Sequence, residues 1–462
     1  MKKIAIIGGG FAGTLTAVQI IEKSTTVCDI ILINDSETLN RGIAYHPYSN
    51  KHLLNVTAEK MSAFPDQPNH FLDWVMQQPD FADKDSTLVA NSFLPRDLYG
   101  TYLTEIWQYA LQSATVKKIN VAVIDGTVTD ISITENTVML SVANNPPFSV
   151  NYCVLATGNN LPRNPPIGNN AFYTSKNYFQ NPWHISSVKG ITQTLPVLII
   201  GNGLTMVDTV LGLMEQHFKG EIYAISPNGF NILSHRHNGL KYTKLTTELS
   251  DNISLFDLVK LINKHIKAVR EYGISAEPII DSLRPHTQRI WQSLTEAEQK
   301  IFMARLRHLW GVARHRIPLH TFDKIMQLRI DGKLHIIAGK ILDINESQTN
   351  ITVDYFDKKE NITQQLNVSR VINCTGPETD IMNLHDSFLK ACLLKGIIRQ
   401  DTLKLGILAN TETFQVKDSN GRLHPHLYTI GGNLRGELWE STAVNELRQQ
   451  AAKLATQLTQ QL

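Results

Sequence analysis

Residues 2–21 read KKIAIIGGGFAGTLTAVQII: an isoleucine-rich run, then glycines, then an amphipathic stretch. This order predicts a buried strand, a glycine turn and a helix. The turn has the spacing G-x-G-x-x-G, in which Gly8 makes the tight turn, Gly10 lets the backbone approach a pyrophosphate and Gly13 lets the helix pack on the strand. The N–H groups of the first helical turn, at Phe11 and Ala12, would face the phosphates. The alternative is a glycine turn without a ligand.

A second buried strand is expected over residues 29–35, DIILIND. At the end of such a strand, an acidic residue binds the ribose hydroxyls of an adenosine. Asn34 stands where the acid is often found and Asp35 follows it, so either is a candidate for this role. The alternative reading is an ordinary turn at the end of a strand.

Composition narrows the class of protein. A chain of 462 residues usually forms two or three domains, and 42% hydrophobic with 19% charged residues is typical of globular proteins. A net charge of +2 argues against nucleic acid as a partner. No H-E-x-x-H or C-x-x-C pattern indicates a metal site, and no apolar run is long enough to span a membrane.

The four cysteines are scattered along the chain, at positions 28, 153, 374 and 392. Sparse cysteine is typical of the reducing cytoplasm, which we expect to be the location of the protein. A flavin disulfide reductase needs a close pair of cysteines, and the sequence contains none.

An internal repeat indicates two units built on one plan. Residues 121–131 (VAVIDGTVTDI) are echoed by residues 334–344 (LHIIAGKILDI), and each copy leads to a short apolar strand that ends in Thr-Gly. The first ending is Thr157-Gly158 and the second closes at Gly376. The alternation within each copy predicts a small antiparallel meander.

The second unit has a glycine turn of its own. Residues 195–200 (LPVLII) predict a buried strand, and Gly201, Gly203, Leu204 and Thr205 follow in the sequence GNGLTMVD, where Met206 replaces the third glycine. The next strand ends in Ser226 rather than an acid. A serine there with basic neighbours favours a 2′-phosphate, hence NADPH over NADH. The candidate bases are Arg236 and Lys241.

Residues 254–312 are expected to be mostly helical, because apolar side chains recur at helical spacing from Leu255 to Ile266. Thr295 and Glu298 form a plausible capping box. We interpret this stretch as an insertion that covers a face of the second unit. The Arg314-His315-Arg316 group that follows is either a site for an anionic substrate or phosphate, or a solvated basic turn.

The last segment is expected to return to the first unit. Residues 427–433 (LYTIGGN) predict a strand and a glycine turn at Gly431 and Gly432. Residues 437–458 follow, in which Ser441, Thr442, Ala443 and Val444 are expected to open a long helix. The N-terminus of this helix would stabilise the negative charge of a reduced flavin.

These residues resemble a known group. The two glycine turns, the Thr-Gly strand ends and the closing Ile-Gly-Gly turn look like flavoproteins with two dinucleotide-binding domains. The stretches GIAYHPYSNKHLLNV, MSAFPDQPNHFLDW, GNGLTMVD, RHRIP and GELWESTAVNELRQQA closely resemble the bacterial FAD-NAD(P)-binding protein family. That family is largely uncharacterised and is distantly similar to flavin-dependent N-hydroxylating monooxygenases.

The resemblance implies an α/β fold of two Rossmann-like domains, similar to glutathione reductase, each with a parallel sheet and a small meander, plus a helical insertion. We expect the FAD-binding domain at residues 1–165 and 366–462, and the NAD(P)-binding domain at 190–365 with the insertion at about 252–320. The first glycine turn would hold the FAD pyrophosphate and the second that of NAD(P)H. The segments predicted to pack against the flavin comprise His52, Leu53, Leu54, Asn55, Val56, Met61 and Ser62.

Three departures from related proteins concern the cofactors. Asn34 replaces the usual acid, and Pro227-Asn228 replaces the basic pair expected after Ser226. Gly432 stands where related reductases carry an aspartate for the ribityl chain. No general base stands out, and His52, Asn55 and Ser62 are the candidates for lining the reaction site.

The resemblance implies an FAD-dependent oxidoreductase that uses NAD(P)H and molecular oxygen to hydroxylate an amine or amino-acid nitrogen through a flavin peroxide. One alternative is an NAD(P)H-dependent flavin reductase or dehydrogenase without oxygen insertion. Another is a flavin-bound sensor or scaffold without turnover. The expected partner is a small molecule, and the substrate and oligomeric state stay open.

Overall fold

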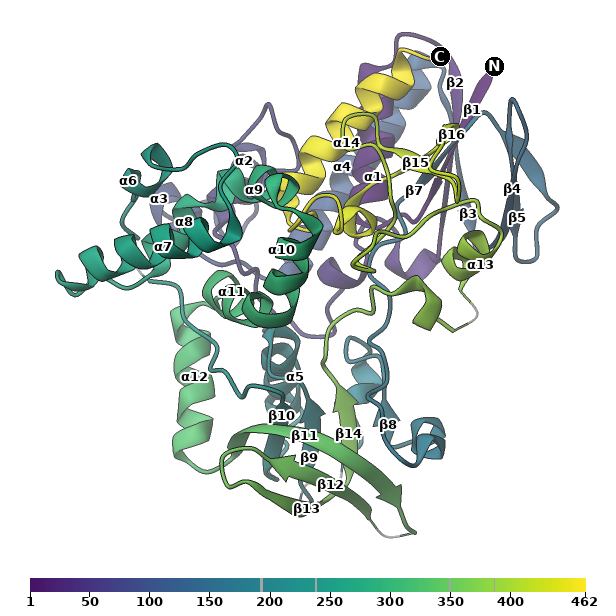
Figure 1. Cartoon of the computed structure of the whole chain (residues 1–462). Coiled ribbons are helices and arrows are strands. Elements are labelled where there is room, and N and C mark those ends of the chain that lie inside the picture. Colours follow the sequence, from purple (N-terminus) through teal and green to yellow (C-terminus); the bar gives the residue numbers. More distant parts are fainter. Residues whose placement is uncertain (192–193, 237–238, 349, 386) are drawn as a thin grey trace.

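The computed structural model describes residues 1–191, 194–236, 239–348, 350–385 and 387–462. A six-stranded sheet of order β15-β16-β7-β1-β2-β3 forms the centre of the first unit (Figure 1). Its strands pair in parallel except for β15 with β16. The strands are β1 (Lys2–Ile7), β2 (Cys28–Asn34), β3 (Asn120–Asp125), β7 (Tyr152–Leu155), β15 (Gln415–Lys417) and β16 (Leu423–Thr429).

The two faces of this sheet are covered differently. Along β1, Ile4 and Ile6 contact one core cluster, and Ala5 and Ile7 contact another, as expected for a strand buried on both faces. The first face is covered by α1 (Phe11–Lys23), α4 (Arg96–Lys117) and α14 (Val444–Thr459). The second is covered by the antiparallel meander of β4 (Val128–Ile133), β5 (Val138–Val142) and β6 (Phe148–Val150), together with α13 (Phe388–Leu394). Two short helices, α2 (His70–Met76) and α3 (Ser86–Ala90), lie in the connection before α4.

The second unit repeats this plan. Its seven-stranded sheet has the order β13-β12-β11-β10-β9-β14-β8, so β11-β10-β9-β14 corresponds to β3-β2-β1-β7 of the first sheet. The strands are β8 (Tyr178–Phe179), β9 (Val197–Ile200), β10 (Ile222–Ser226), β11 (Leu334–Glu346), β12 (Ile351–Asp357), β13 (Ile362–Val368) and β14 (Arg370–Asn373). Helices α5 (Leu204–Glu215) and α12 (Leu319–Ile330) cover one face. The α/β fold expected from the sequence is confirmed.

The internal repeat is visible in the meanders. Each copy has an irregularity at the equivalent place, between Val128 and Asp130 in β4 and between Ile341 and Asp343 in β11. The copies differ at the preceding glycine. At Gly126 (φ +156°) the chain leaves the parallel sheet and starts a separate meander, whereas β11 runs on through Gly339 and belongs to both the parallel and the antiparallel part.

Helices between β10 and α12 form the insertion expected from the sequence. They are α6 (Lys244–Thr247), α7 (Leu255–Arg270), α8 (Glu277–Ser282), α9 (Thr287–Ser293), α10 (Glu296–Ile301) and α11 (Arg307–Arg314), with a π-helical turn at Phe302–Leu306. The capping box of Thr295 and Glu298 is present at α10.

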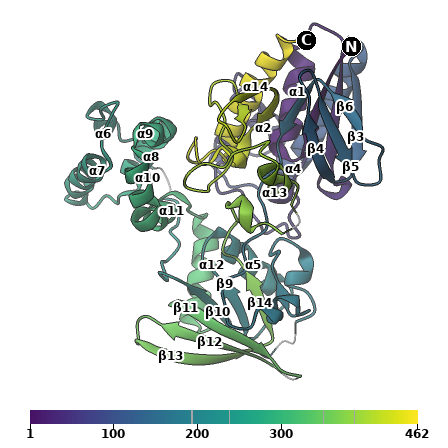
Figure 2. The ribbon, with the colours of Figure 1, turned by 45° about the vertical axis from the view of Figure 1, so that its right-hand side comes forward.

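The expectation that the insertion covers a face of the second unit is wrong. The helices pack on one another, and their aromatic edge packs on the C-terminal segment, where Trp291 stacks on Trp439 at 5.0 Å between ring centroids and donates from Nε1 to the carbonyl of Gly436 at 2.7 Å. Figure 2 shows the helices set apart from the second sheet.

The final helix begins at Val444, within the expected opening, and Glu440 before it has φ +64°, which an α-helix does not admit. The boundary expected at 365/366 needs correction. It falls too early, because β14 pairs with β9 in the second sheet, and β8 joins that sheet before residue 190. We propose that the second unit runs from about β8 to β14.

Over the described residues, no helix is both long enough and apolar enough to cross a membrane. In the same part of the chain, no group of three His, Cys, Asp or Glu side chains is arranged to hold a metal ion. All four cysteines are free and buried.

Candidate dinucleotide and substrate site

The first glycine turn connects β1 to α1. Gly8 has φ +101°, and a Cβ atom there would lie 2.2 Å from the carbonyl oxygen of Ala156 in the neighbouring strand end. A Cβ at Gly13 would lie 1.8 Å from the carbonyl oxygen of Gly8. Both positions therefore require glycine, as the spacing predicts.

The N-terminus of α1 is open to a ligand. Its N-cap is Gly10, and no side chain caps the free N–H groups at this end. Phe11 is buried against Tyr45 and Tyr99, while the Cβ of Ala12 faces the position of Gly431. Gly10 is approached by Gly42, whose φ is +56°. Uncapped N–H groups next to glycines fit a pyrophosphate.

The second turn reproduces the first. Gly201 has φ +103°, and a Cβ there would lie 2.5 Å from the carbonyl oxygen of Cys374, the counterpart of Ala156. Gly203 is the N-cap of α5, again without a capping side chain, and the space beside it is open. Leu204 and Thr205 form the first turn of this helix. Met206 is fully buried in the core under α5.

The candidate ribose residues are engaged in local hydrogen bonds. The Oδ1 atom of Asn34 accepts from the N–H of Gly9 at 2.8 Å, so this side chain braces the glycine turn. The exposed carboxylate of Asp35 accepts from the N–H of Glu37. In the second unit, Oγ of Ser226 accepts from the N–H of Gly229 at 3.1 Å.

Beside the end of β10 lies a lysine other than the two expected bases. Nζ of Lys358, in the turn after β12, donates to the carbonyl of Pro227 at 2.6 Å. The backbone N–H of Arg236 instead meets Glu277 in the helical insertion, and Lys241 is exposed. Sequence spacing could not indicate Lys358, because β12 reaches this place only through its pairing with β11.

Three predicted residues from distant parts of the chain, Thr157, Gly158 and Gly432, converge where β7 and β16 end. Asn433 Nδ2 donates to Oγ1 of Thr157 at 3.1 Å and thereby joins the two strand ends. A Cβ at Gly432 would lie 3.2 Å from Oδ1 of Asn159 and 3.5 Å from the carbonyl oxygen of Gly158. The amide of Asn159 thus lies beside the position where related reductases carry an aspartate.

Residues directly before α14, the last helix, also contact the glycine turn that follows β16. Ser441 Oγ donates to the carbonyl of Gly431 at 2.7 Å, and the methyl group of Thr442 faces Gly432. The N-cap of α14, Ala443, provides no capping side chain. Gly376 of the second unit matches Gly158 in the internal repeat. It has φ +89°, and a Cβ atom there would meet no atom within 4 Å.

The segment 52–56 lies between the two units. Leu53 and Leu54 pair with residues 94–95 through the main chain, and Leu54 is buried. His52 Nε2 lies 3.0 Å from the carbonyl oxygen of Asp208 in α5, and Nη1 of Arg96 lies 3.0 Å from the carboxylate of the same residue. A recess lined by His52, Arg96 and Asp208 lies at this junction.

The three candidates for lining the reaction site have structural partners. Burial lowers the pKa of His52, so its imidazole is neutral at pH 7. The carbonyl of Asn55 accepts from His235, and Ser62 is fully buried and donates to the carbonyl of Gln67 at 2.6 Å. The packing of Val56 and Met61 against a flavin stays a prediction.

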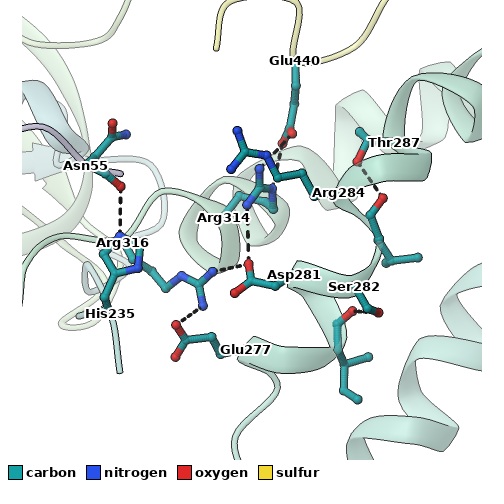
Figure 3. A network of polar contacts seen from close by, with 12 residues as sticks. Asn55, His235, Glu277, Asp281, Ser282, Arg284, Thr287, Arg314, Arg316 and Glu440 are labelled. Atoms are coloured by element: carbon teal, nitrogen blue, oxygen red, sulfur yellow. Dashed lines mark hydrogen bonds and ion pairs between the residues drawn. The ribbon is translucent and has the colours of Figure 1, made fainter. Parts of the chain in front are cut away.

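The Arg314-His315-Arg316 group matches neither expected reading (Figure 3). Arg314 makes two hydrogen bonds to the carboxylate of Glu440, at 3.1 and 3.2 Å. Arg316 is only 3% exposed and forms ion pairs with Glu277 and Asp281 of α8. The two arginines are therefore neutralised by acids of the insertion and of the C-terminal segment.

Comparison with known proteins agrees with this arrangement. Residues 5–160 match a family model described as FAD-NAD(P)-binding. The "Uncharacterized protein YdhS" of Escherichia coli (strain K12) is 26% identical over 253 residues, which are 53% of this chain and 45% of that protein. The chain thus matches less than half the length of this curated relative.

Solved structures resemble the whole chain. The reduced ornithine hydroxylase PvdA from Pseudomonas aeruginosa matches with a TM-score of 0.68, at 12% identity over 100% of this chain and 99% of that one. The L-lysine 6-monooxygenase from Pseudomonas syringae matches with a TM-score of 0.63, at 16% identity over 100% and 99% of the two chains. At these identities the likeness establishes the fold.

The chain thus has an architecture of two Rossmann-type units, a fold that it shares with solved flavin monooxygenases. The expected resemblance to FAD-NAD(P)-binding proteins is confirmed over residues 5–160, and the expected likeness to N-hydroxylating flavin monooxygenases is confirmed for the fold.

Proposed function

We propose that the protein is an FAD- and NAD(P)H-dependent monooxygenase that hydroxylates the nitrogen of an amine or amino acid. The observation that carries the proposal is the matched pair of glycine turns. Gly8 and Gly201 have φ values within 2° of one another, and α1 and α5 both begin without a capping side chain. One chain thus offers two pyrophosphate cradles of the same design.

We assign the first cradle, with Gly10 and the converging Gly158 and Gly432, to FAD. The second cradle, at Gly203, would take NAD(P)H. The uncapped N-terminus of α14 would stabilise negative charge at the nearby end of the cofactor. When bound, FAD supplies hydride acceptance and the reaction with oxygen. The chain contributes binding, orientation and exclusion of water.

The proposed reaction is R–NH2 + O2 + NAD(P)H + H⁺ → R–NHOH + NAD(P)⁺ + H2O. One oxygen atom enters the N–H bond of the substrate, and the other leaves as water with the two electrons of the hydride. Because the neutral His52 is held at Asp208, we assign it to positioning of the two units rather than to proton transfer. The whole-chain likeness to amino-acid hydroxylases supports the substrate class.

The test is a screen of the FAD-loaded protein against L-amino acids and polyamines. NAD(P)H oxidation, oxygen uptake, hydrogen peroxide release and product mass are measured together. We expect at least one substrate whose mass increases by one oxygen atom, in an amount close to the NAD(P)H consumed. FAD-loaded protein without substrate is the control for uncoupled oxidation.

Oxidation of NAD(P)H with all oxygen recovered as peroxide, for every substrate, would replace the proposal with a flavin reductase. A yellow protein that does not oxidise NAD(P)H at all would indicate a sensor or scaffold. A protein that stays colourless after incubation with FAD would contradict the assignment of the first cradle.

A further inference from the structure

The segment between the first cradle and α14 contains a glutamate in an unfavourable backbone conformation. Glu440 has φ +64°, a left-handed conformation that glycine and asparagine adopt more readily than glutamate. The N–H of Ser441 donates to the carbonyl of Leu438 at 3.2 Å, so Glu440 is the third residue of a turn, a position where glycine or asparagine often provides a positive φ. A glutamate in such a place indicates that its side chain is needed there.

The carboxylate of Glu440 binds one helix of the insertion. Oε1 accepts from Nε of Arg314 at 3.2 Å, and Oε2 accepts from Nη2 of the same residue at 3.1 Å (Figure 3). Oε1 also accepts from Nε1 of Trp310 at 2.8 Å. Trp310 and Arg314 are four residues apart and therefore share one face of α11. Because the side chains of Arg314 and Glu440 are only 11% and 14% exposed, these charge-assisted hydrogen bonds fix α11 against Glu440.

Another helix of the insertion contacts the same segment. The carbonyl of Gly436 accepts from Nε1 of Trp291 at 2.7 Å, and the ring of Trp439 stacks on the ring of Trp291. Residues 436–440 are therefore held by both α9 and α11. These helices are inserted between β10 and α12 of the second sheet, whereas residues 436–440 follow β16 of the first sheet.

On its other side, this segment is fastened to the first cradle. Ser441, which directly follows Glu440, is fully buried and donates from Oγ to the carbonyl of Gly431 at 2.7 Å. A Cβ atom at Gly431 would lie 3.8 Å from the Cβ of Ala12, in the first turn of α1. A change in the position of Glu440 therefore displaces Ser441 and, through it, the glycine turn that faces α1.

We propose that Glu440 is a positioning residue that couples docking of the helical insertion to binding of FAD at the first cradle. This inference rests on the assignment of FAD in the proposed function, and it does not depend on the reaction. The docked insertion holds Glu440 in its turn, and the turn holds Gly431 and Gly432 where they can receive the cofactor. Because such coupling is reciprocal, FAD must strengthen docking by the same factor by which docking strengthens the binding of FAD.

The first measurement compares amide hydrogen exchange of the wild-type protein with and without FAD. Amides of α9 and α11 should exchange about tenfold or more slowly when FAD is bound, although these helices lie outside the first cradle. Strands β12 and β13, at the far edge of the second sheet, provide the reference and should exchange at the same rate in both samples.

Two variants break the contact from opposite sides. Arg314→Gln removes the guanidinium group within the insertion. Glu440→Asn suits the turn, but its side chain is one carbon shorter and carries no charge. Each variant should raise the Kd for FAD about 10- to 100-fold, measured by titration of FAD-depleted protein through flavin fluorescence. The double variant should lose no more than the larger single loss, because both changes remove one contact.

Arg289→Gln is the matched control, because Arg289 is also an arginine of the insertion but pairs with Asp251 inside it. It should bind FAD as the wild type does. Circular dichroism and the melting temperature of each FAD-free variant establish that it is folded. If a variant is unfolded, the exchange comparison decides alone, because it needs no substitution.

Equal exchange of α9 and α11 with and without FAD would overturn the inference. So would Kd values for FAD in Arg314→Gln and Glu440→Asn that equal the wild-type value, and both results would leave FAD assigned to the first cradle. A loss in Glu440→Asn without a loss in Arg314→Gln would show that the turn acts without the insertion, which also overturns the coupling. A wild-type protein that binds no FAD would overturn the inference together with the assignment of the first cradle.

Discussion

Neither packing nor backbone conformation requires a glycine at position 203. A Cβ there would meet no atom within 4 Å, and its φ of −88° suits any residue. Gly203→Ala should therefore fold normally but obstruct the approach of a pyrophosphate to α5. We expect KM for NAD(P)H to rise about tenfold or more, with FAD content and melting temperature unchanged. Steady-state kinetics and flavin absorption measure both effects.

Gly239→Ala is the control, because Gly239 also faces open space but lies outside both glycine turns. Equal KM values for the wild-type protein and Gly203→Ala would remove the second cradle from the proposed site.

Lys358 provides a test of coenzyme preference. Its ammonium group lies beside Pro227, directly after the strand end where the adenosine ribose would bind. If it binds a 2′-phosphate, Lys358→Glu should raise KM for NADPH about 10- to 100-fold and leave KM for NADH nearly unchanged. The control Lys359→Glu changes the next lysine, which is 86% exposed and paired with Glu360. A parallel loss for both coenzymes would contradict a role in phosphate recognition.

At the scale of elements, the ion pairs of Arg316 attach α8 to the segment that follows α11. Arg316→Met would leave the partly buried Glu277 uncompensated and Asp281 paired with Arg314 alone, at a cost of about 3–5 kcal/mol in the free energy of unfolding. Chemical denaturation followed by tryptophan fluorescence would measure it. The exposed pair of Lys359 and Glu360 is the comparison, where Lys359→Ala should change stability by less than about 1 kcal/mol. A similarly small effect at Arg316 would show that the network adds no stability.

His235 makes the junction of these elements sensitive to pH. Burial, followed by the nearby charge of Arg316, lowers its pKa from 6.5 to about 4. The unfolded chain then binds the proton more readily than the folded one, so this contribution to stability is complete above pH 6.5 and lost as the pH falls towards 4. We expect the melting temperature to fall over this range, and to fall less steeply in His235→Gln. Identical slopes for the two proteins would contradict this assignment.

At the scale of the whole molecule, the proposed hydride transfer from one nucleotide to the other requires the two units to be held together. Arg96 and Asp208 form an ion pair across the junction, with side chains only 19% and 14% exposed, and His52 contacts the same residue of α5. Asp208→Asn should leave FAD content unchanged and slow anaerobic flavin reduction by NADPH by about 10- to 100-fold, because small displacements of reacting groups are costly. Stopped-flow absorption would measure the rate.

Lys395→Ala is the matched control, because it breaks an exposed ion pair with Asp130 inside the first unit. An unchanged reduction rate in Asp208→Asn would mean that the junction is held by apolar contacts alone.

Much of the architecture is local in origin and could be predicted. The glycine turns at Gly8 and Gly201, the strands before them and the repeated meander follow from patterns of a few adjacent residues. The sequence placed Gly158 and Gly432 in the same unit, and the structure brings them together because strand ends of one parallel sheet lie at one edge. The partners of Arg314 and Arg316 could not be predicted, since they depend on where separate helices dock.

The sequence by itself determined that this chain forms two glycine-turn α/β units, because turn geometry and strand burial are properties of short segments. Only the tertiary structure decided which side chains surround the candidate site. Lys358 and Asp208 reach it from separate parts of the chain. Long-range packing of amphipathic helices and strands sets such positions, and no local spacing encodes them.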